Sequence, residues 1–219
     1  MERVERLWAG AGRVVAPRHG ATRARAMSVR DDAGAAASLA RLDDPALVAA
    51  CLAGRREAFD VIVERHRRAV YGLCYRYVGN HEDASDAAQE VFLRAYRALG
   101  RFKGDASIGT WLYRIGVNAC LNRLASRPPA AEPIGTTEAI ADGSPDPASR
   151  LLQRERSSRV RAAIVRLPAR QRTTLILRVY HDLSHQEIAS IVGSSVGAVK
   201  ANFFHALRNL KKILERDPV

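Results

Sequence analysis

Apolar residues recur at spacings of three and four along two stretches of the chain, and this period is typical of amphipathic helices. The first stretch predicts four helices, which begin at Asp44-Pro45, near Phe59, at about His81 and after Ser107. The second predicts three or four more, over residues 150–166, 169–180, 184–192 and 196–214. No alternating strand pattern interrupts them. The sequence therefore predicts an all-α fold of two small helical domains, over residues 41–126 and 153–216.

Two segments lack this period. Residues 1–40 are rich in Ala, Arg and Gly, so we expect a disordered basic arm, with Met27 as an alternative start. Residues 127–152 contain prolines among Gly, Ser, Thr and acidic residues. This composition predicts a flexible linker between the two domains.

The charge of the chain indicates a polyanionic partner. Its 219 residues carry a formal net charge of +12, while 47% apolar residues are enough for packed cores. Residues 154–216 contain 13 Lys and Arg against 4 Asp and Glu, a net charge of +9. Nucleic acid is the leading candidate and an anionic membrane surface the weaker one. No apolar run is long enough to span a bilayer, so we expect no membrane insertion and a cytoplasmic location.

Candidate catalytic or metal-binding chemistry is sparse. Cys51, Cys74 and Cys120 lack CxxC spacing and lie within apolar helical patterns, which favours buried reduced thiols. His181 and His185 are the only histidines clustered with acids, but a turn separates them, so they do not share a helix face as a zinc pair would. No Gly-rich phosphate loop occurs. We therefore expect no catalytic residue, metal, cofactor or small-molecule substrate, and no enzymatic activity.

The segment from Leu183 to Leu214 has the features of a DNA-binding helix-turn-helix. Ser184 and Glu187 fit a capping box, Gly193 permits a tight turn, and Ser194 or Ser195 can cap the next helix. The apolar stripe of that second helix is predicted to be buried and consists of Val196, Val199, Phe203, Leu207, Leu210 and Leu214. The alternative is an ordinary helical hairpin with a solvated charged face.

The opposite face of that helix is predicted to contact DNA. Small residues at its start let it enter a major groove, where Lys200, Asn202 and His205 can reach base edges. Basic residues further along, among them Lys211 and Lys212, suit the phosphate backbone. The predicted contact set is Ser195, Val196, Gly197, Lys200, Ala201, Asn202, Phe204, His205 and Arg208.

The helix predicted over residues 81–99 has one face that changes sign along its length. Its acidic half suits a basic protein surface, and its basic half, beside Phe102 and Lys103, suits a phosphate backbone. The face comprises Glu82, Asp83, Asp86 and Glu90, followed by Arg94, Arg97 and Arg101. A solvated face is the alternative, because the helix dipole alone favours acids at the start and arginines at the end.

Three motifs carry a family resemblance. Asp83-Ala-Ser-Asp-Ala-Ala-Gln-Glu-Val-Phe92, Arg101-Phe-Lys-Gly-Asp-Ala-Ser107 and Thr110-Trp-Leu-Tyr-Arg-Ile-Gly-Val-Asn118 closely resemble regions 2.2 to 2.4 of extracytoplasmic-function (ECF) sigma factors, group IV of the sigma-70 family. The stretch from Leu167 to Leu214 resembles their region 4. The resemblance implies a factor that binds core RNA polymerase and directs promoter recognition and opening for a stress or envelope response. A stand-alone helix-turn-helix regulator that binds operator DNA is the alternative.

The resemblance also implies roles for individual residues. The contact with the β′ clamp helices of core polymerase falls on Asp83, Asp86, Gln89 and Glu90. The −10 element falls to Arg94, Arg97, Arg101, Phe102, Lys103, Gly104, Asp105, Ala106, Arg114 and Asn118, with Asn118 in the pocket for a flipped base. Region 4 is expected to read the −35 element and to meet the β flap. An anti-sigma factor is an expected partner, and Trp111 has either a core or a base-stacking role.

Some positions depart from the family pattern. Ser85, Ala87 and Ala88 stand where the clamp-binding motif commonly has acidic, leucine and threonine residues. In the second helix of the helix-turn-helix, arginines and a serine are often found where this chain has Lys200, Ala201, Asn202 and His205. The −35 preference of relatives therefore cannot be transferred to this chain.

Overall fold

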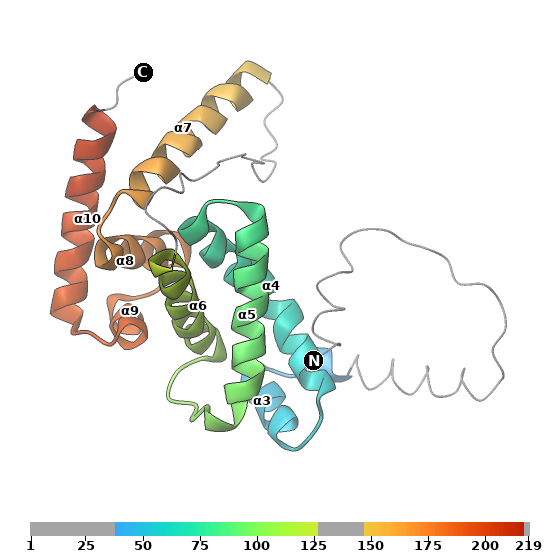
Figure 1. Ribbon diagram of the computed structural model, residues 1–219. Helices are drawn as coiled ribbons and strands as arrows, with labels where there is room; N and C mark the ends of the chain where they lie inside the picture. Colours follow the sequence, from blue (N-terminus) through green and yellow to red (C-terminus); the bar gives the residue numbers. More distant parts are fainter. Residues whose placement is uncertain (1–37, 127–146, 217–219) are drawn as a thin grey trace, which may run out of the picture. The chain divides into compact units, whose positions relative to one another are not determined.

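The computed structural model describes residues 38–126 and 147–216. The predicted arm and most of the predicted linker lie outside these residues. Figure 1 shows α3 (Asp44–Leu52), α4 (Glu57–Val78), α5 (His81–Ala98), the 3-10 turn η1 (Leu99–Arg101), α6 (Ile108–Ala125), α7 (Pro147–Val165), α8 (Ala169–Tyr180), α9 (His185–Val192) and α10 (Val196–Arg216). Across the described residues the secondary structure is entirely helical, and the predicted all-α fold is confirmed. Helix α7 begins at Pro147, so it extends into the stretch that was predicted to be a linker.

Short polar side chains begin several of these helices. The backbone amide of Ala46 donates to a carboxylate oxygen of Asp43 over 2.9 Å at the start of α3, one residue before the start expected at Asp44. At the start of α6, the amide of Thr110 donates to the hydroxyl of Ser107 over 3.0 Å, as predicted. Each bond satisfies a backbone N–H that the helix itself leaves without an acceptor. No helix in the described part of the chain is long and apolar enough to cross a membrane.

The chain divides into two compact units. The first contains the described residues up to Arg68 together with Gln89–Leu112. Its core is formed by large apolar side chains that are almost fully buried, including Leu47, Phe59, Ile62, Phe92 and Leu112. The ring of Tyr96 lies with its centroid 5.0 Å from that of Phe59, in an edge-on arrangement.

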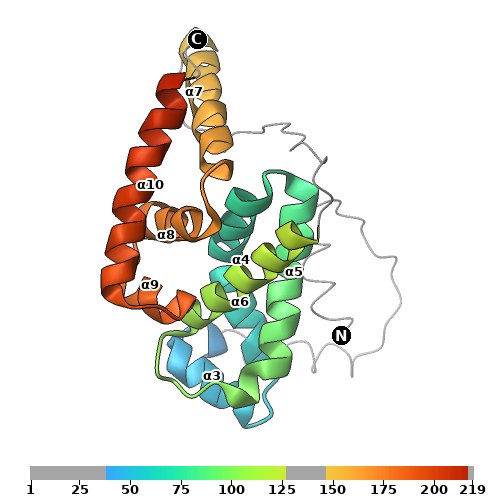
Figure 2. The ribbon, with the colours of Figure 1, turned by 60° about the vertical axis from the view of Figure 1, so that its left-hand side comes forward.

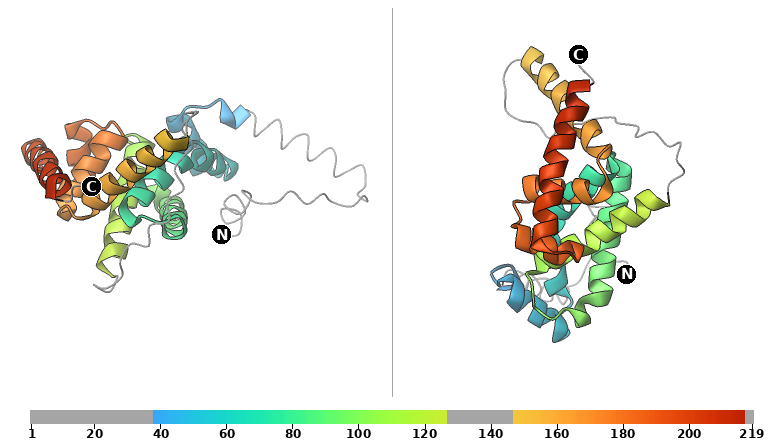
Figure 3. Two further views of the ribbon diagram at one scale, coloured as in Figure 1. Left: turned by 90° about the horizontal axis from the view of Figure 1, so that it is seen from above. Right: turned by 90° about the vertical axis from the view of Figure 1, so that its left-hand side faces the viewer.

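The second unit contains residues 69–88 and the described residues from Tyr113 onward. Helix α10 packs on α7, α8 and α9, and Figures 2 and 3 show it running alongside them. The phenol of Tyr77 is 1% exposed and donates to the hydroxyl of Thr173 over 2.8 Å, so α4 and α8 share one buried polar contact. Cys74 and Cys120 are buried in this unit, whereas Cys51, in the first unit, is half-buried.

The buried stripe of α10 differs in one position from the prediction. Val199 is fully buried, but Leu207 is 46% exposed and Ala206 is buried instead. The residues that face the other helices are spaced from Val199 by four and then seven, so the stripe passes through position 206. The close approach of α10 to its neighbours is made by a small side chain, and the prediction for Leu207 was wrong.

Candidate nucleic-acid interface

The turn between α9 and α10 is built as the sequence predicts. The Ser184 amide donates to a carboxylate oxygen of Glu187 over 2.8 Å, and the Glu187 amide donates back to the Ser184 hydroxyl over 3.2 Å. These bonds hold the pKa of Glu187 below its usual value. Gly193 has a φ of 62°, in the left-handed region that favours glycine. The second cap is Ser195, whose hydroxyl accepts from the Ala198 amide over 3.2 Å.

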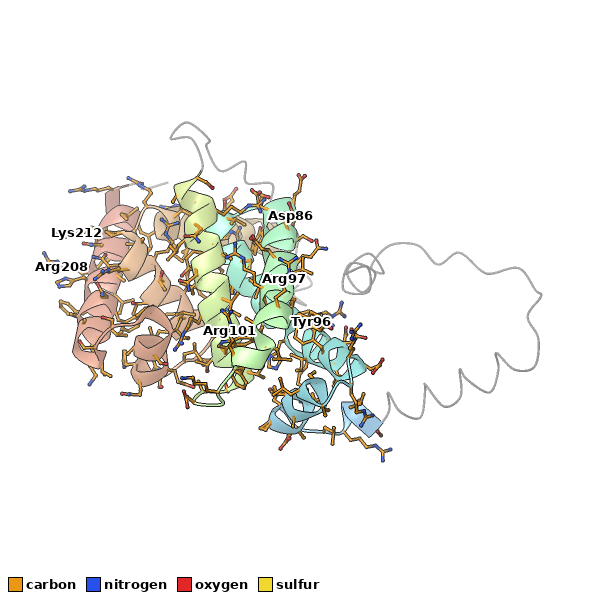
Figure 4. The ribbon with its side chains drawn as sticks, turned by 60° about the horizontal axis from the view of Figure 1, so that its bottom comes forward. Asp86, Tyr96, Arg97, Arg101, Arg208 and Lys212 are labelled. Atoms are coloured by element: carbon orange, nitrogen blue, oxygen red, sulfur yellow. The ribbon has the colours of Figure 1, made fainter. Side chains whose placement is uncertain are left out.

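The outer face of α10 presents the predicted DNA-contacting residues to solvent. Phe204 is 64% exposed, and Val196 and Asn202 are half-buried. The remaining predicted −35 residues are exposed, namely Ser195, Gly197, Lys200, Ala201, His205 and Arg208. Figure 4 shows Arg208 and Lys212 on the outer side of α10. The face combines cations with an exposed aromatic ring, as nucleic-acid-binding surfaces do.

The predicted −10 loop lies beside a cavity in the first unit. The cavity has a volume of about 330 Å³ and is lined by Phe102, Lys103, Gly104 and Ala106, together with α3. Asp105, also in the loop, is exposed. The Phe102 ring lies 5.2 Å from that of Trp111, centroid to centroid, so Trp111 is half-buried beside the loop rather than fully in the core. An apolar cavity flanked by a cationic side chain has the chemistry to accept a flat base.

Two further predicted −10 residues lie on α6 in the second unit. Asn118 is exposed and lines a cavity of about 210 Å³, whose wall also includes Asn202 of the predicted −35 set. A guanidinium nitrogen of Arg114 donates to the backbone carbonyl of Ser190 over 2.7 Å and contacts the Ser190 hydroxyl over 3.0 Å. The structure therefore brings residues of the two predicted DNA sites together, which nothing in the sequence indicated.

The predicted polymerase-binding face of α5 is accessible, but its carboxylates are paired within the chain. Arg123 on α6 lies 2.6 Å from a carboxylate oxygen of Asp83 and 3.4 Å from one of Asp86. These carboxylates raise the pKa of the Arg123 guanidinium, the bond to Asp83 contributing most. The other two predicted residues, Gln89 and Glu90, are half-buried, and Glu90 pairs with Arg94. The sequence analysis missed Arg123, because it lies far along the chain from the acids it binds.

The basic half of the same face is exposed. Figure 4 labels Asp86, Arg97 and Arg101, which follow one another along α5 and the turn after it. Tyr96, which the sequence analysis did not single out, is 41% exposed next to Arg97. Its position among Arg94, Arg97 and Arg101 is the signal that could have identified it, since aromatic rings interleaved with cations are typical of nucleic-acid surfaces.

His181 serves to hold α6 and the end of α8 together. One of its ring nitrogens, Nδ1, lies 3.1 Å from the hydroxyl of Tyr113. Burial, aided by the nearby charge of Arg76, lowers the pKa of His181 to about 4. Among the residues described, no group of three or more His, Cys, Asp or Glu side chains is placed to hold a metal ion.

A capped helix, a left-handed glycine turn and an exposed basic second helix define a helix-turn-helix DNA-binding protein. Family models for sigma-70 region 2 and sigma-70 region 4 match residues 62–128 and 157–210. The RNA polymerase sigma-H factor of Pseudomonas aeruginosa is 34% identical over 186 residues, which cover 81% of this chain and 96% of that protein. The ECF RNA polymerase sigma-E factor of Escherichia coli K12 is 37% identical over 176 residues, covering 76% and 91%. The chain belongs to the ECF sigma factors of the sigma-70 family.

Solved structures give the same result. The structure of CnrH in complex with the cytosolic domain of CnrY matches with a TM-score of 0.62 and 26% sequence identity. The match covers 80% of this chain and 99% of CnrH. The resemblance stated from the sequence motifs is therefore confirmed in both sequence and fold.

Proposed function

We propose that this chain is the promoter-specificity factor of RNA polymerase: it binds the core enzyme, recognises promoter DNA at two elements and opens the duplex between them. The observation that carries this is the exposed cationic and aromatic face of α10, presented by a fully capped helix-turn-helix. The region 2 match disfavours a stand-alone regulator, which would not need that second module. Such a factor positions DNA and polymerase and carries out no bond chemistry of its own.

The proposed division of labour follows the surfaces described above. The acids of α5, including Asp83 and Asp86, meet the β′ clamp helices, while the loop over Phe102–Ala106 and Asn118 handle the −10 element. The outer face of α10 reads the −35 element, and the same helical region meets the β flap. An anti-sigma factor is part of the proposal, supported by the solved complex of the relative CnrH with a domain of CnrY.

Promoter binding requires the second unit to open. Asn118 and Asn202 line one cavity, yet positions −10 and −35 are about 25 base pairs apart, or ~85 Å along B-DNA. Both residues cannot contact their elements in this closed arrangement. We infer that core polymerase binding separates α6 from α8 to α10, which breaks the contacts Tyr77–Thr173, Tyr113–His181 and Arg114–Ser190.

The decisive experiment reconstitutes the chain with core polymerase on a promoter library and measures run-off transcription. We expect transcripts from promoters that share defined −10 and −35 sequences. A chain that protects a palindrome without core enzyme, and never supports run-off transcription, would be a stand-alone regulator. Asn118→Ala should impair promoter opening more than polymerase binding, whereas its exposed neighbour Asn122, changed to Ala, should impair neither. Equal loss of opening and binding in Asn118→Ala would contradict the base-pocket role.

A further inference from the structure

A groove that contains none of the residues assigned above runs across α4, α7 and α8 in the second unit. Its volume is about 440 Å³. Tyr75 and Arg76 line it from the end of α4, Arg156 and Arg161 from α7, and Tyr180 from the end of α8. The groove is therefore formed by the two groups of helices that the proposed opening separates.

The groove concentrates positive charge without an acidic counterpart. Three arginines line it, and no Asp or Glu does. The Arg76 guanidinium lies 3.8 Å above the centre of the Tyr180 ring. The Nε of Arg76 and one terminal nitrogen of Arg161 are buried with no hydrogen-bond acceptor among the described residues. Burial of donors without acceptors is unfavourable, so a ligand that supplies carboxylates would remove this cost.

The pKa of Arg76 reports the same situation. Burial lowers the pKa of its guanidinium, the Tyr180 ring opposes this shift, and the positive charge of Arg161 lowers it further. The two guanidinium groups therefore repel each other across the groove. An anion between them would relieve this repulsion.

The floor of the groove is apolar, which decides between two kinds of anionic partner. Val160, Ile164 and Val165 of α7 line it beneath the arginines. A phosphodiester backbone cannot bury aliphatic side chains, whereas an amphipathic protein segment covers them with its own apolar face. A protein partner therefore fits this groove better than a nucleic acid does.

We propose that the groove binds an acidic amphipathic segment of a partner protein, which places carboxylates on Arg76, Arg156 and Arg161 and apolar side chains on the α7 floor. Because the groove spans helices that must separate, a bound segment favours the closed arrangement and opposes promoter binding. This consequence rests on the proposed function. The binding itself does not.

The test uses the full-length chain and a fluorescent, about 20-residue helical peptide with leucines on one face and glutamates on the other. Anisotropy at about 0.15 M salt should show that R156E/R161E binds the peptide at least tenfold more weakly than the unchanged chain. The matched control is R55E/R56E, which changes the net charge equally at exposed positions outside the groove and should lose less than twofold. R156Q/R161Q, checked for folding by circular dichroism, gives the same comparison if charge reversal disturbs α7.

Three results would overturn the proposal. Equal losses in the groove and control variants would mean that the peptide responds only to the net charge of the chain. A groove variant that loses affinity for a random DNA duplex, but not for the peptide, would make the groove a nucleic-acid site. Peptide affinity that rises tenfold when Glu132, Glu138 and Asp142 are changed to amides would assign the groove to the chain's own acidic stretch. Run-off transcription is measured separately, so failure of the proposed function remains distinguishable.

Discussion

The outer faces of α5 and α10 are both charged, but their charges are held differently. On α5, Asp83 and Asp86 are engaged by Arg123, and Glu90 by Arg94. On α10, Lys200 and Arg208 form no ion pair with another described residue. Docking on α5 therefore exchanges one ionic partner for another, whereas docking on α10 only releases counterions. The first arrangement favours selectivity for a protein surface, and the second favours affinity for DNA.

The largest expected effect is on the unpaired face. R208E/K212E should weaken promoter binding by the holoenzyme about 100-fold and lower the slope of log affinity against log salt by about 2, because two phosphate contacts become repulsions. R97E/R101E, the same change on α5, sharpens the comparison: a comparable loss would show that its basic half also contacts DNA. Anisotropy over a salt series measures both. An unchanged slope in R208E/K212E would contradict the assignment of α10.

The second effect concerns how firmly α10 is held, since α10 packs on α8 and His181 follows that helix. The pKa of His181 is about 4 in the folded chain, against 6.5 for an unperturbed histidine. The unfolded chain therefore binds the extra proton first as pH falls. Stability is complete above pH 6.5 and decreases below it, by up to about 2 kcal/mol at pH 5. Urea unfolding at pH 7.5 and pH 5 measures this, and His181→Asn should flatten the difference; an equal decrease in that variant would assign it to other groups.

The third effect tests the paired face. Asp86→Asn should lower the affinity for core polymerase about tenfold, because an exposed carboxylate that meets a basic surface contributes about that much. Glu82→Gln is the matched control, since Glu82 is exposed on the same acidic half and is not assigned to the contact. Equal affinities in the two variants would favour the alternative that α5 carries a merely solvated charged face.

Features that depend on a few neighbouring residues could be predicted from the sequence. The capping box of Ser184 and Glu187, the left-handed Gly193 and the Ser107 cap each involve residues at most a few positions apart. The hydrophobic period also located the helices, because each must bury one face. The turn and the caps of the candidate site therefore follow from short-range sequence patterns alone.

Features that depend on tertiary contacts could not be predicted. Leu207 and Ala206 are adjacent, and only the packing of α10 on α8 decides which of them is buried. Arg123 lies 40 residues from Asp83, and Asn118 meets Asn202 only when two distant helices come together. The same limit hid the closed arrangement, because each predicted DNA site was complete in the sequence without the other.

The smallest effect is the most specific test of the comparison. If Arg123 competes with polymerase for the α5 carboxylates, Arg123→Ala should raise the affinity for core polymerase, by about threefold, since exposed ion pairs are weak. Arg67→Ala, which removes an exposed pair with Glu64, should leave it unchanged. A lower affinity in Arg123→Ala would mean that this guanidinium orients Asp83 for docking rather than occupying it. Titration of core polymerase with labelled chain distinguishes the two, because competition and orientation change the affinity in opposite directions.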